Sequence, residues 1–188
     1  MSKPVSRRRR RRPKKKKWPY VILVIVILIG SGLAASLILG YNPLLDRQLR
    51  SQFGNEFFND FGDLSPAENG NDLDSIVANY SPAFESLQDQ AMNRLDDLLA
   101  TALEEYYAQE RAGTVDRFKL TNKYIQAGRI LENNVDATFY SLLDEMKAEL
   151  ERNNLPLARA TEISDTYEKA KADKKRELLD LLRQRVGE

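Results

Sequence analysis

The feature that most constrains this chain is a block of positive charge followed directly by a long apolar run. Residues Val21 to Leu39 carry no charge. As a helix they would extend about 28 Å, close to the ~30 Å hydrocarbon core of a bilayer. Asn42-Pro43 interrupts the helix just beyond this run. The sequence therefore predicts one transmembrane helix within residues 18–41.

Aromatic residues flank the apolar run on both sides. Trp18 and Tyr20 precede it, and Tyr41 follows it. Amphipathic rings favour the headgroup level of a bilayer. We therefore expect these three side chains to lie at the two membrane interfaces.

Residues 1–17 form a basic tail with 11 basic and no acidic residues. Because such blocks stay on the cytoplasmic side, we expect a cytoplasmic N-terminus and an extracytoplasmic C-terminus in a cell membrane. The tail would also contact anionic lipid of the cytoplasmic leaflet. The residues expected to make this contact are Arg7, Arg8, Arg9, Arg10, Arg11, Arg12, Lys14, Lys15, Lys16 and Lys17. Nucleic acid is disfavoured as a partner because no aromatic residue alternates with these charges to stack on bases.

A cleaved secretory signal is an alternative interpretation of the same segment. Gly32-Leu33-Ala34 would suit a signal peptidase, and removal of residues 1–34 would release a secreted helical protein. The apolar run continues through Leu37 to Leu39, which favours the uncleaved anchor. Gly32 and Ser36 lie one helical turn apart, so close packing of two spans in a homo-oligomer is a further alternative.

The composition of the remaining chain argues against catalysis. It has 18 basic and 28 acidic residues, a net charge of −10, and the whole chain lacks Cys and His. It therefore lacks the commonest metal ligand and the usual general base near neutral pH. Adjacent carboxylates such as Asp96-Asp97 diverge by about 100° on a helix and do not converge on one substrate atom. We expect no enzyme activity and no cofactor or metal.

Residues 42–72 are expected to form a juxtamembrane amphipathic segment and a linker. Apolar residues recur every four positions, which on a helix makes one stripe that Gly54 would weaken. The stripe suits either the outer membrane interface, favoured for its first half, or packing onto the following domain. Ser65 to Asp72 has the composition of a linker. The stripe residues that form a candidate partner or interface surface are Phe53, Phe57 and Phe61.

Residues 73–188 are expected to form an extracytoplasmic helical domain. After a short turn over 74–79, three long helices are predicted at 81–113, 116–153 and 157–186. The first would have Ser81 as N-cap and Pro82 at its first position. Apolar stripes, with Phe118 included in the second, and short connections predict an antiparallel three-helix bundle. Gly128 suggests close backbone approach within the stripe of the second helix.

The third helix has a thinner stripe and an almost entirely charged middle, so we expect the first two helices to form the main hairpin. The third would be held less firmly midway. A long parallel coiled-coil dimer is the alternative that the apolar spacing also allows.

The predicted fold is all-α: one N-terminal transmembrane helix followed by an extracytoplasmic antiparallel bundle of three long helices. The predicted function is a single-pass, membrane-anchored, non-enzymatic interaction or scaffold protein that presents an acidic bundle to another envelope protein or a cell-wall component. The alternative is a membrane-tethered, holdase-like chaperone for exported proteins, which would need an exposed apolar concavity.

Overall fold

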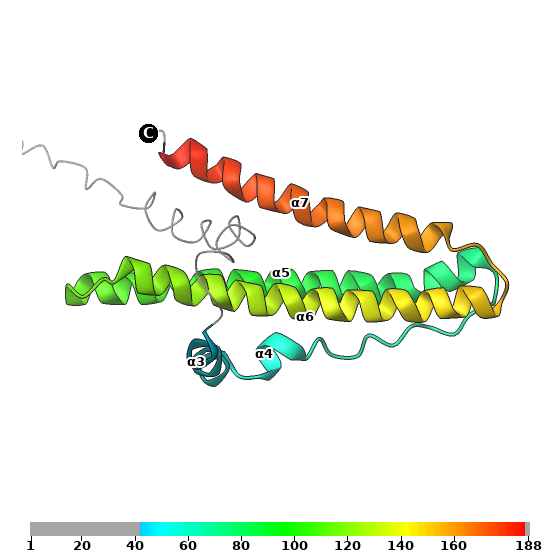
Figure 1. Cartoon of the computed structure of the whole chain (residues 1–188), viewed down its shortest axis with the longest axis horizontal. Helices are drawn as coiled ribbons and strands as arrows, with labels where there is room; N and C mark the ends of the chain where they lie inside the picture. The colour runs from blue at the N-terminus through cyan, green and yellow to red at the C-terminus, as the bar shows by residue number, and fades with distance from the viewer. Residues whose placement is uncertain (1–41, 187–188) are drawn as a thin grey trace, which may run out of the picture.

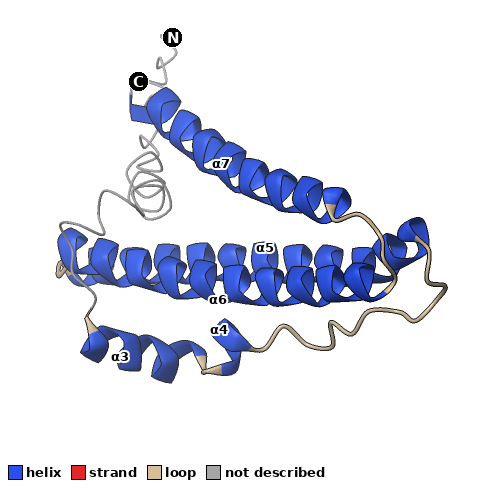
Figure 2. Ribbon diagram, turned by 45° about the vertical axis from the view of Figure 1, so that its right-hand side comes forward, coloured by secondary structure: helices blue, strands red, loops and turns tan. Residues whose placement is uncertain are grey.

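The computed structural model describes residues 42–186, which form helices and connecting loops with no strand (Figures 1 and 2). The all-helical prediction is confirmed for this part of the chain. The helices are α3 (Pro43–Phe53), α4 (Glu56–Asn59), α5 (Leu73–Ala112), α6 (Arg117–Arg152) and α7 (Ala158–Val186).

Among residues 42–186, none of the helices combines the length and the apolar character that crossing a bilayer requires. The predicted span, 18–41, and the predicted basic tail, 1–17, lie outside the described residues.

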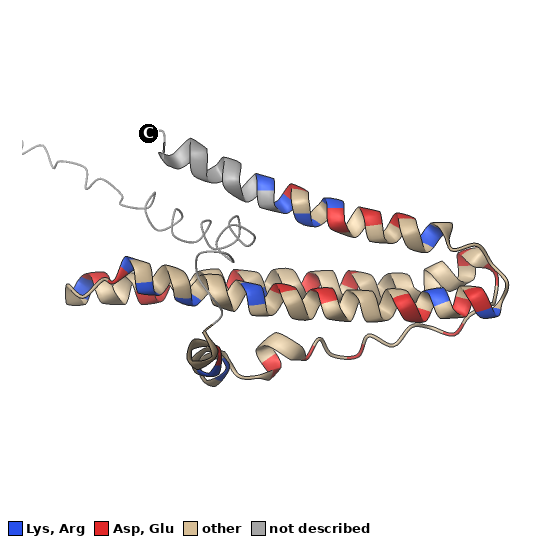
Figure 3. Ribbon diagram, viewed as in Figure 1, with Lys and Arg blue, Asp and Glu red and all other residues tan. Residues whose placement is uncertain are grey.

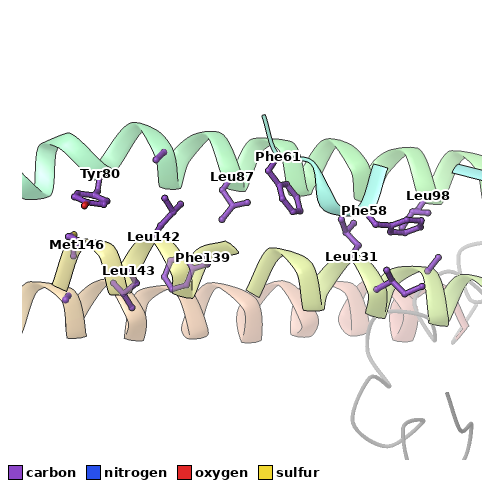
Figure 4. Close-up of a cluster of buried hydrophobic side chains, with 14 of the residues drawn as sticks. Phe58, Phe61, Tyr80, Leu87, Leu98, Leu131, Phe139, Leu142, Leu143 and Met146 are labelled. Carbon is purple, nitrogen blue, oxygen red and sulfur yellow. The ribbon is translucent and has the colours of Figure 1, made fainter. Parts of the chain in front are cut away.

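Helices α5 and α6 form a long antiparallel hairpin. Gly113 ends α5 in the left-handed conformation, with φ of 69°, and its N–H donates to the carbonyl of Glu110. Asp116 then caps α6 by accepting a hydrogen bond from the backbone N–H of Lys119. The facing sides of the two helices supply most of the core, as Figure 4 shows. The hairpin is the scaffold on which the other elements dock.

Helix α5 begins nine residues earlier than the sequence suggested. Its N-cap is Asp72 rather than Ser81, and Pro82 lies inside the helix. The prediction was wrong because Ile76 and Tyr80 are buried against the rest of the domain, and this burial favours a continuous helix despite the proline. The Ser81 hydroxyl donates to the carbonyl of Val77, 2.9 Å away. The first turns of α5 are tilted from the rest of the helix (Figure 2).

Helices α3 and α4 cover one side of the hairpin. The expected stripe is broken at Gly54, whose φ of 86° ends α3. Leu49 and Phe58 are fully buried against the core, so the stripe packs onto the domain, which is the second of its two predicted locations. The Arg94 guanidinium fixes the following turn by donating to the carbonyls of Phe57 and Asp60.

Helix α7 docks on the hairpin by its first half. Ala160 is fully buried, and Ile163 and Tyr167 pack partly buried against the core. Toward its C-terminal end α7 diverges from the hairpin (Figures 1 and 2). The α5–α6 hairpin agrees with the expected main hairpin. In the charged middle of α7, Lys171 lies 2.8 Å from Asp136 of α6, so the expectation that α7 is held less firmly midway stays a prediction. Charged residues of both signs lie along the first half of α7 and on α5 and α6 (Figure 3).

Candidate functional site

The divergence of α7 leaves a groove between it and the hairpin, with a volume of about 710 Å³. The surface of the groove is formed mainly by apolar side chains from three helices. These are Phe84, Leu87, Ala91, Met92 and Leu95 from α5, Leu131, Val135 and Phe139 from α6, and Ile163, Tyr167 and Ala170 from α7. Charged side chains, among them Glu85, Arg129 and Lys174, also line it. A mainly apolar concavity of this size is typical of a binding site.

An aromatic cluster lines the groove and joins α7 to the hairpin. The rings of Phe139 and Tyr167 stack with centroids 3.7 Å apart and planes 11° apart. Phe84 approaches Phe139 from α5 at 5.2 Å, and Tyr140 meets Tyr167 edge-on at 6.2 Å. Such pairs add stabilisation beyond the area they bury. All three long helices therefore meet at Phe139.

A polar network lies beside the aromatic cluster. The Tyr167 hydroxyl donates to the Asp136 carboxylate, and the Lys171 ammonium lies 2.8 Å from the same carboxylate. Lys171 also lies 3.8 Å from Glu132 and 3.6 Å from Glu168. We call Asp136, Tyr167 and Lys171 the latch, because they join α6 to α7.

The latch raises the pKa of Tyr167 and of Lys171. Burial raises the pKa of Tyr167, and the hydrogen bond to Asp136 raises it further. Burial alone would lower the pKa of Lys171, but the hydrogen bond and charge of Asp136, with Glu168 and Glu132, raise it overall. Both side chains therefore keep their protons at neutral pH. Lys171 is then a cation and Tyr167 a neutral phenol, and both contact Asp136.

Two features of the sequence bear on this groove, Gly128 and the charged middle of α7. Gly128 lines it, and a Cβ placed there would meet no atom within 4 Å. The expected close helix approach at Gly128 is therefore wrong, because the position faces open space rather than a partner helix. The charged middle of α7 predicts a third helix that is held less firmly, which stays a prediction. The apolar spacing within one helix does not show whether its neighbours leave a concavity beside it.

The predicted aromatic surface has a different position in the structure. Phe61 is 3% exposed, with the Arg94 guanidinium 4.3 Å above its ring, and Phe53 and Phe57 are partly buried against the core. Their rings contact each other at 5.2 Å. Within one chain these residues attach α3 and α4 to the hairpin. Their role toward a partner stays a prediction.

The remaining predicted site residues lie outside the described part of the chain. These are the aromatic residues Trp18, Tyr20 and Tyr41 and the basic residues 7–12 and 14–17.

Among the side chains that the structure describes, those of residues 42–174 and 176, no three acidic groups gather closely enough to hold a metal ion. No protein-family model, curated protein or solved structure matches this chain. What is known of the groove is therefore its lining and its size.

Proposed function

We propose that the chain is a single-pass, membrane-anchored, non-enzymatic interaction protein that binds an apolar helix of another envelope protein. In this proposal residues 18–41 are the anchor, with a cytoplasmic N-terminus, and the helical domain lies outside the cytoplasm. The observation that carries the proposal is the apolar groove between α7 and the hairpin. A polar cell-wall polymer would suit this floor less well.

The dimensions of the groove favour a helical ligand. Its lining extends from Phe84 to Leu95 on α5 and from Arg159 to Lys174 on α7. At 1.5 Å per residue these stretches measure about 16 and 22 Å. A guest helix of three to four turns would match this length. An amphipathic helix that lays its apolar face in a groove is a recurrent mode of recognition.

The polar residues around the groove support binding rather than catalysis. Asp136 is committed to Tyr167 and Lys171, and Arg159 pairs with Glu162 at 2.7 Å. These pairs join or stabilise helices and do not point two titratable groups at one reacting atom, as acid–base catalysis needs. The chain also has no His or Cys to act as nucleophile or base.

Site-specific photo-cross-linking in intact cells tests the proposal. A photoreactive amino acid is introduced at Met92 in the groove of the full-length protein, and at Asp97 on an exposed surface. We expect one discrete protein adduct from position 92 and none of that size from position 97. Mass spectrometry of the adduct should identify a peptide with apolar residues at helical spacing.

A matched pair of substitutions controls for folding. Ala91→Phe fills the groove, whereas Ala100→Phe adds the same ring to an exposed position of the same helix. The adduct should be lost with Ala91→Phe and retained with Ala100→Phe, while both variants keep the helical signal in circular dichroism. An equal adduct in both variants would show that the partner binds elsewhere.

The groove also favours the holdase-like chaperone as a second candidate, because it is an exposed apolar concavity. A chaperone would give many adducts of different size at Met92 instead of one. It would also suppress aggregation of an unfolded client protein, and Ala91→Phe would weaken that suppression more than Ala100→Phe. No suppression by the full-length protein would remove this candidate.

A further inference from the structure

Two large apolar side chains are strongly exposed near the point where the chain enters the helical domain. Leu44 is 74% exposed in the first turn of α3, and Phe118 is 70% exposed in the first turn of α6. The sequence pattern predicted that Phe118 would belong to the buried stripe of its helix, which is wrong. Phe118 therefore presents a large apolar ring that the described part of the chain leaves uncovered.

The entry point of the chain is fixed on α6. The carbonyl of Asn42 accepts a hydrogen bond from the side-chain amide of Gln126, 2.7 Å away, and the Asn42 side chain caps α3. The apolar run ends at Leu39, three residues earlier. Three residues of extended chain span at most about 11 Å. If residues 18–41 are the anchor, the surface of α6 around Gln126 lies within about that distance of the bilayer.

Phe118 lies nearer the hairpin tip than this entry point and about a quarter turn around α6 from it. It precedes Gln126 by eight residues, which is about 12 Å along the helix and about 80° around it. Lys119 precedes Gln126 by seven residues, about 20° around the helix, and is also exposed. Two distances are therefore similar: about 12 Å along α6 from Gln126 to Phe118, and at most about 11 Å from the end of the apolar run to Asn42. If the apolar run ends at the bilayer, the hairpin tip can reach the bilayer surface.

We infer that the tip of the α5–α6 hairpin rests on the outer surface of the membrane, with Phe118 inserted among the lipid headgroups. Lys119 lies beside it and supplies a positive charge for the lipid phosphates. An aromatic ring next to a basic residue is the combination that interfacial membrane contacts use. This inference rests on the proposed anchor, and it adds an orientation: the tip faces the bilayer, and the α6–α7 end points away from it.

The native tryptophan makes the anchor and the tip separately testable. The chain has one Trp, Trp18, at the start of the proposed span. The full-length protein is reconstituted into vesicles of equal parts phosphatidylcholine and phosphatidylglycerol, with a nitroxide quencher on the lipid headgroup. Quenching of Trp18 in the unmodified protein reports the anchor alone.

The tip is then tested in a Trp18→Phe background. Phe118→Trp places the probe at the tip, and Tyr140→Trp is the matched aromatic control, 22 residues further along α6. We expect strong quenching at position 118 and loss of that quenching at position 140. Circular dichroism of both variants checks that the helices are intact.

Each outcome decides the inference. Quenching of Trp18 together with stronger quenching at 118 than at 140 supports it. Quenching of Trp18 with equal or weaker quenching at 118 overturns the inference and leaves the anchor in place, so that Phe118 would then face a protein partner. No quenching of Trp18 overturns both the inference and the proposed anchor.

Discussion

Two glycines of the hairpin differ in backbone conformation, so substitutions at the two positions can be compared directly. Gly113 has φ of 69°, a conformation that side-chain-bearing residues adopt only with strain, whereas Gly128 lies within helix α6. At neither position would an added Cβ meet an atom within 4 Å. A substitution at these positions therefore reports backbone conformation alone.

Gly128→Ala should raise the free energy of unfolding by roughly 0.5–1 kcal/mol, because alanine loses less backbone entropy than glycine in a helix. Gly113→Ala should lower it by about 1 kcal/mol or more through left-handed strain. Urea unfolding of the full chain in detergent, followed by helical circular dichroism, measures both. Changes of the same sign in the two variants would contradict this assignment.

The same residues show what a single sequence can and cannot predict about positions. Gly128 and Phe118 both fit the apolar spacing of their helix, yet one faces an open groove and the other is exposed at the tip. Spacing fixes which residues share a face of a helix. Whether that face meets a neighbour depends on where the neighbour ends or diverges, which the local pattern does not contain.

At the scale of single elements, α5 shows tertiary packing prevailing over local propensity. Ser81-Pro82 has the pattern of a helix start, but Asp72 caps the helix and the chain continues through the proline. The second and third helices were predicted to within one or two residues, because their ends coincide with Asp116, Asn153 and Pro156, which signal caps and breaks strongly. The error at α5 arose because burial of Ile76 and Tyr80 outweighs the break.

Replacing this proline tests that explanation. Pro82→Ala restores a donor to the carbonyl of Ala78 and removes the clash of the ring with the preceding turn, so the domain should gain about 1–3 kcal/mol. The gain should appear as a higher urea midpoint with an unchanged denaturant slope. A loss of stability would show instead that the tilt at Pro82 is needed to seat Tyr80, whose hydroxyl donates to Glu149.

The docking of α7 depends on the latch, which is partly open to solvent. The side chains of Asp136 and Lys171 are 29% and 22% exposed. Asp136→Asn keeps the shape and removes the charge, so we expect a loss of about 0.5–1 kcal/mol, as for partly exposed ion pairs. Amide hydrogen exchange in the first half of α7 should accelerate up to about fivefold, with little change in the α5–α6 core.

Asp165→Asn is the matched control for the latch, since it removes the same charge from an exposed position of α7. It should leave the exchange of α7 nearly unchanged. Equal acceleration in the two variants would mean that general charge on α7, rather than the contact with Asp136, decides its docking.

At the scale of the whole molecule, the domain is a hairpin of α5 and α6. Helices α3 and α4 cover one side of it, and α7 covers another side only partly. The sequence predicted three helices, short connections and a weakly held third helix. It did not predict the groove, because a concavity arises from the angle between α7 and the hairpin. That angle depends on contacts such as Phe139 with Tyr167, between residues 28 positions apart. The groove and the divergence of α7 from the hairpin are therefore one structural property.

Interior tyrosines give the whole domain a defined response to alkaline pH. Burial raises the pKa of Tyr80 to about 12, with a further contribution from Glu149. Burial also raises the pKa of Tyr124 and Tyr167, with contributions from the carboxylates of Glu105 and Asp136. The folded protein keeps these protons at pH values where the unfolded chain has lost them. Their contribution to stability is therefore intact below about pH 10 and declines as pH rises above it.

Tyr124 is a suitable residue for measuring how stability depends on pH. Its hydroxyl donates a hydrogen bond to Glu105, 2.9 Å away, within the hairpin. In the full chain, the free energy of unfolding should fall between about pH 10 and 12 with a slope that corresponds to two to three protons. Tyr124→Phe should reduce that slope by about one proton, while lowering stability at neutral pH by roughly 1 kcal/mol through loss of the hydrogen bond. Urea titrations at a series of pH values give both quantities. A slope that is unchanged in the variant would mean that Tyr124 ionises alike in the folded and unfolded chain, and that the hairpin does not exclude water from it.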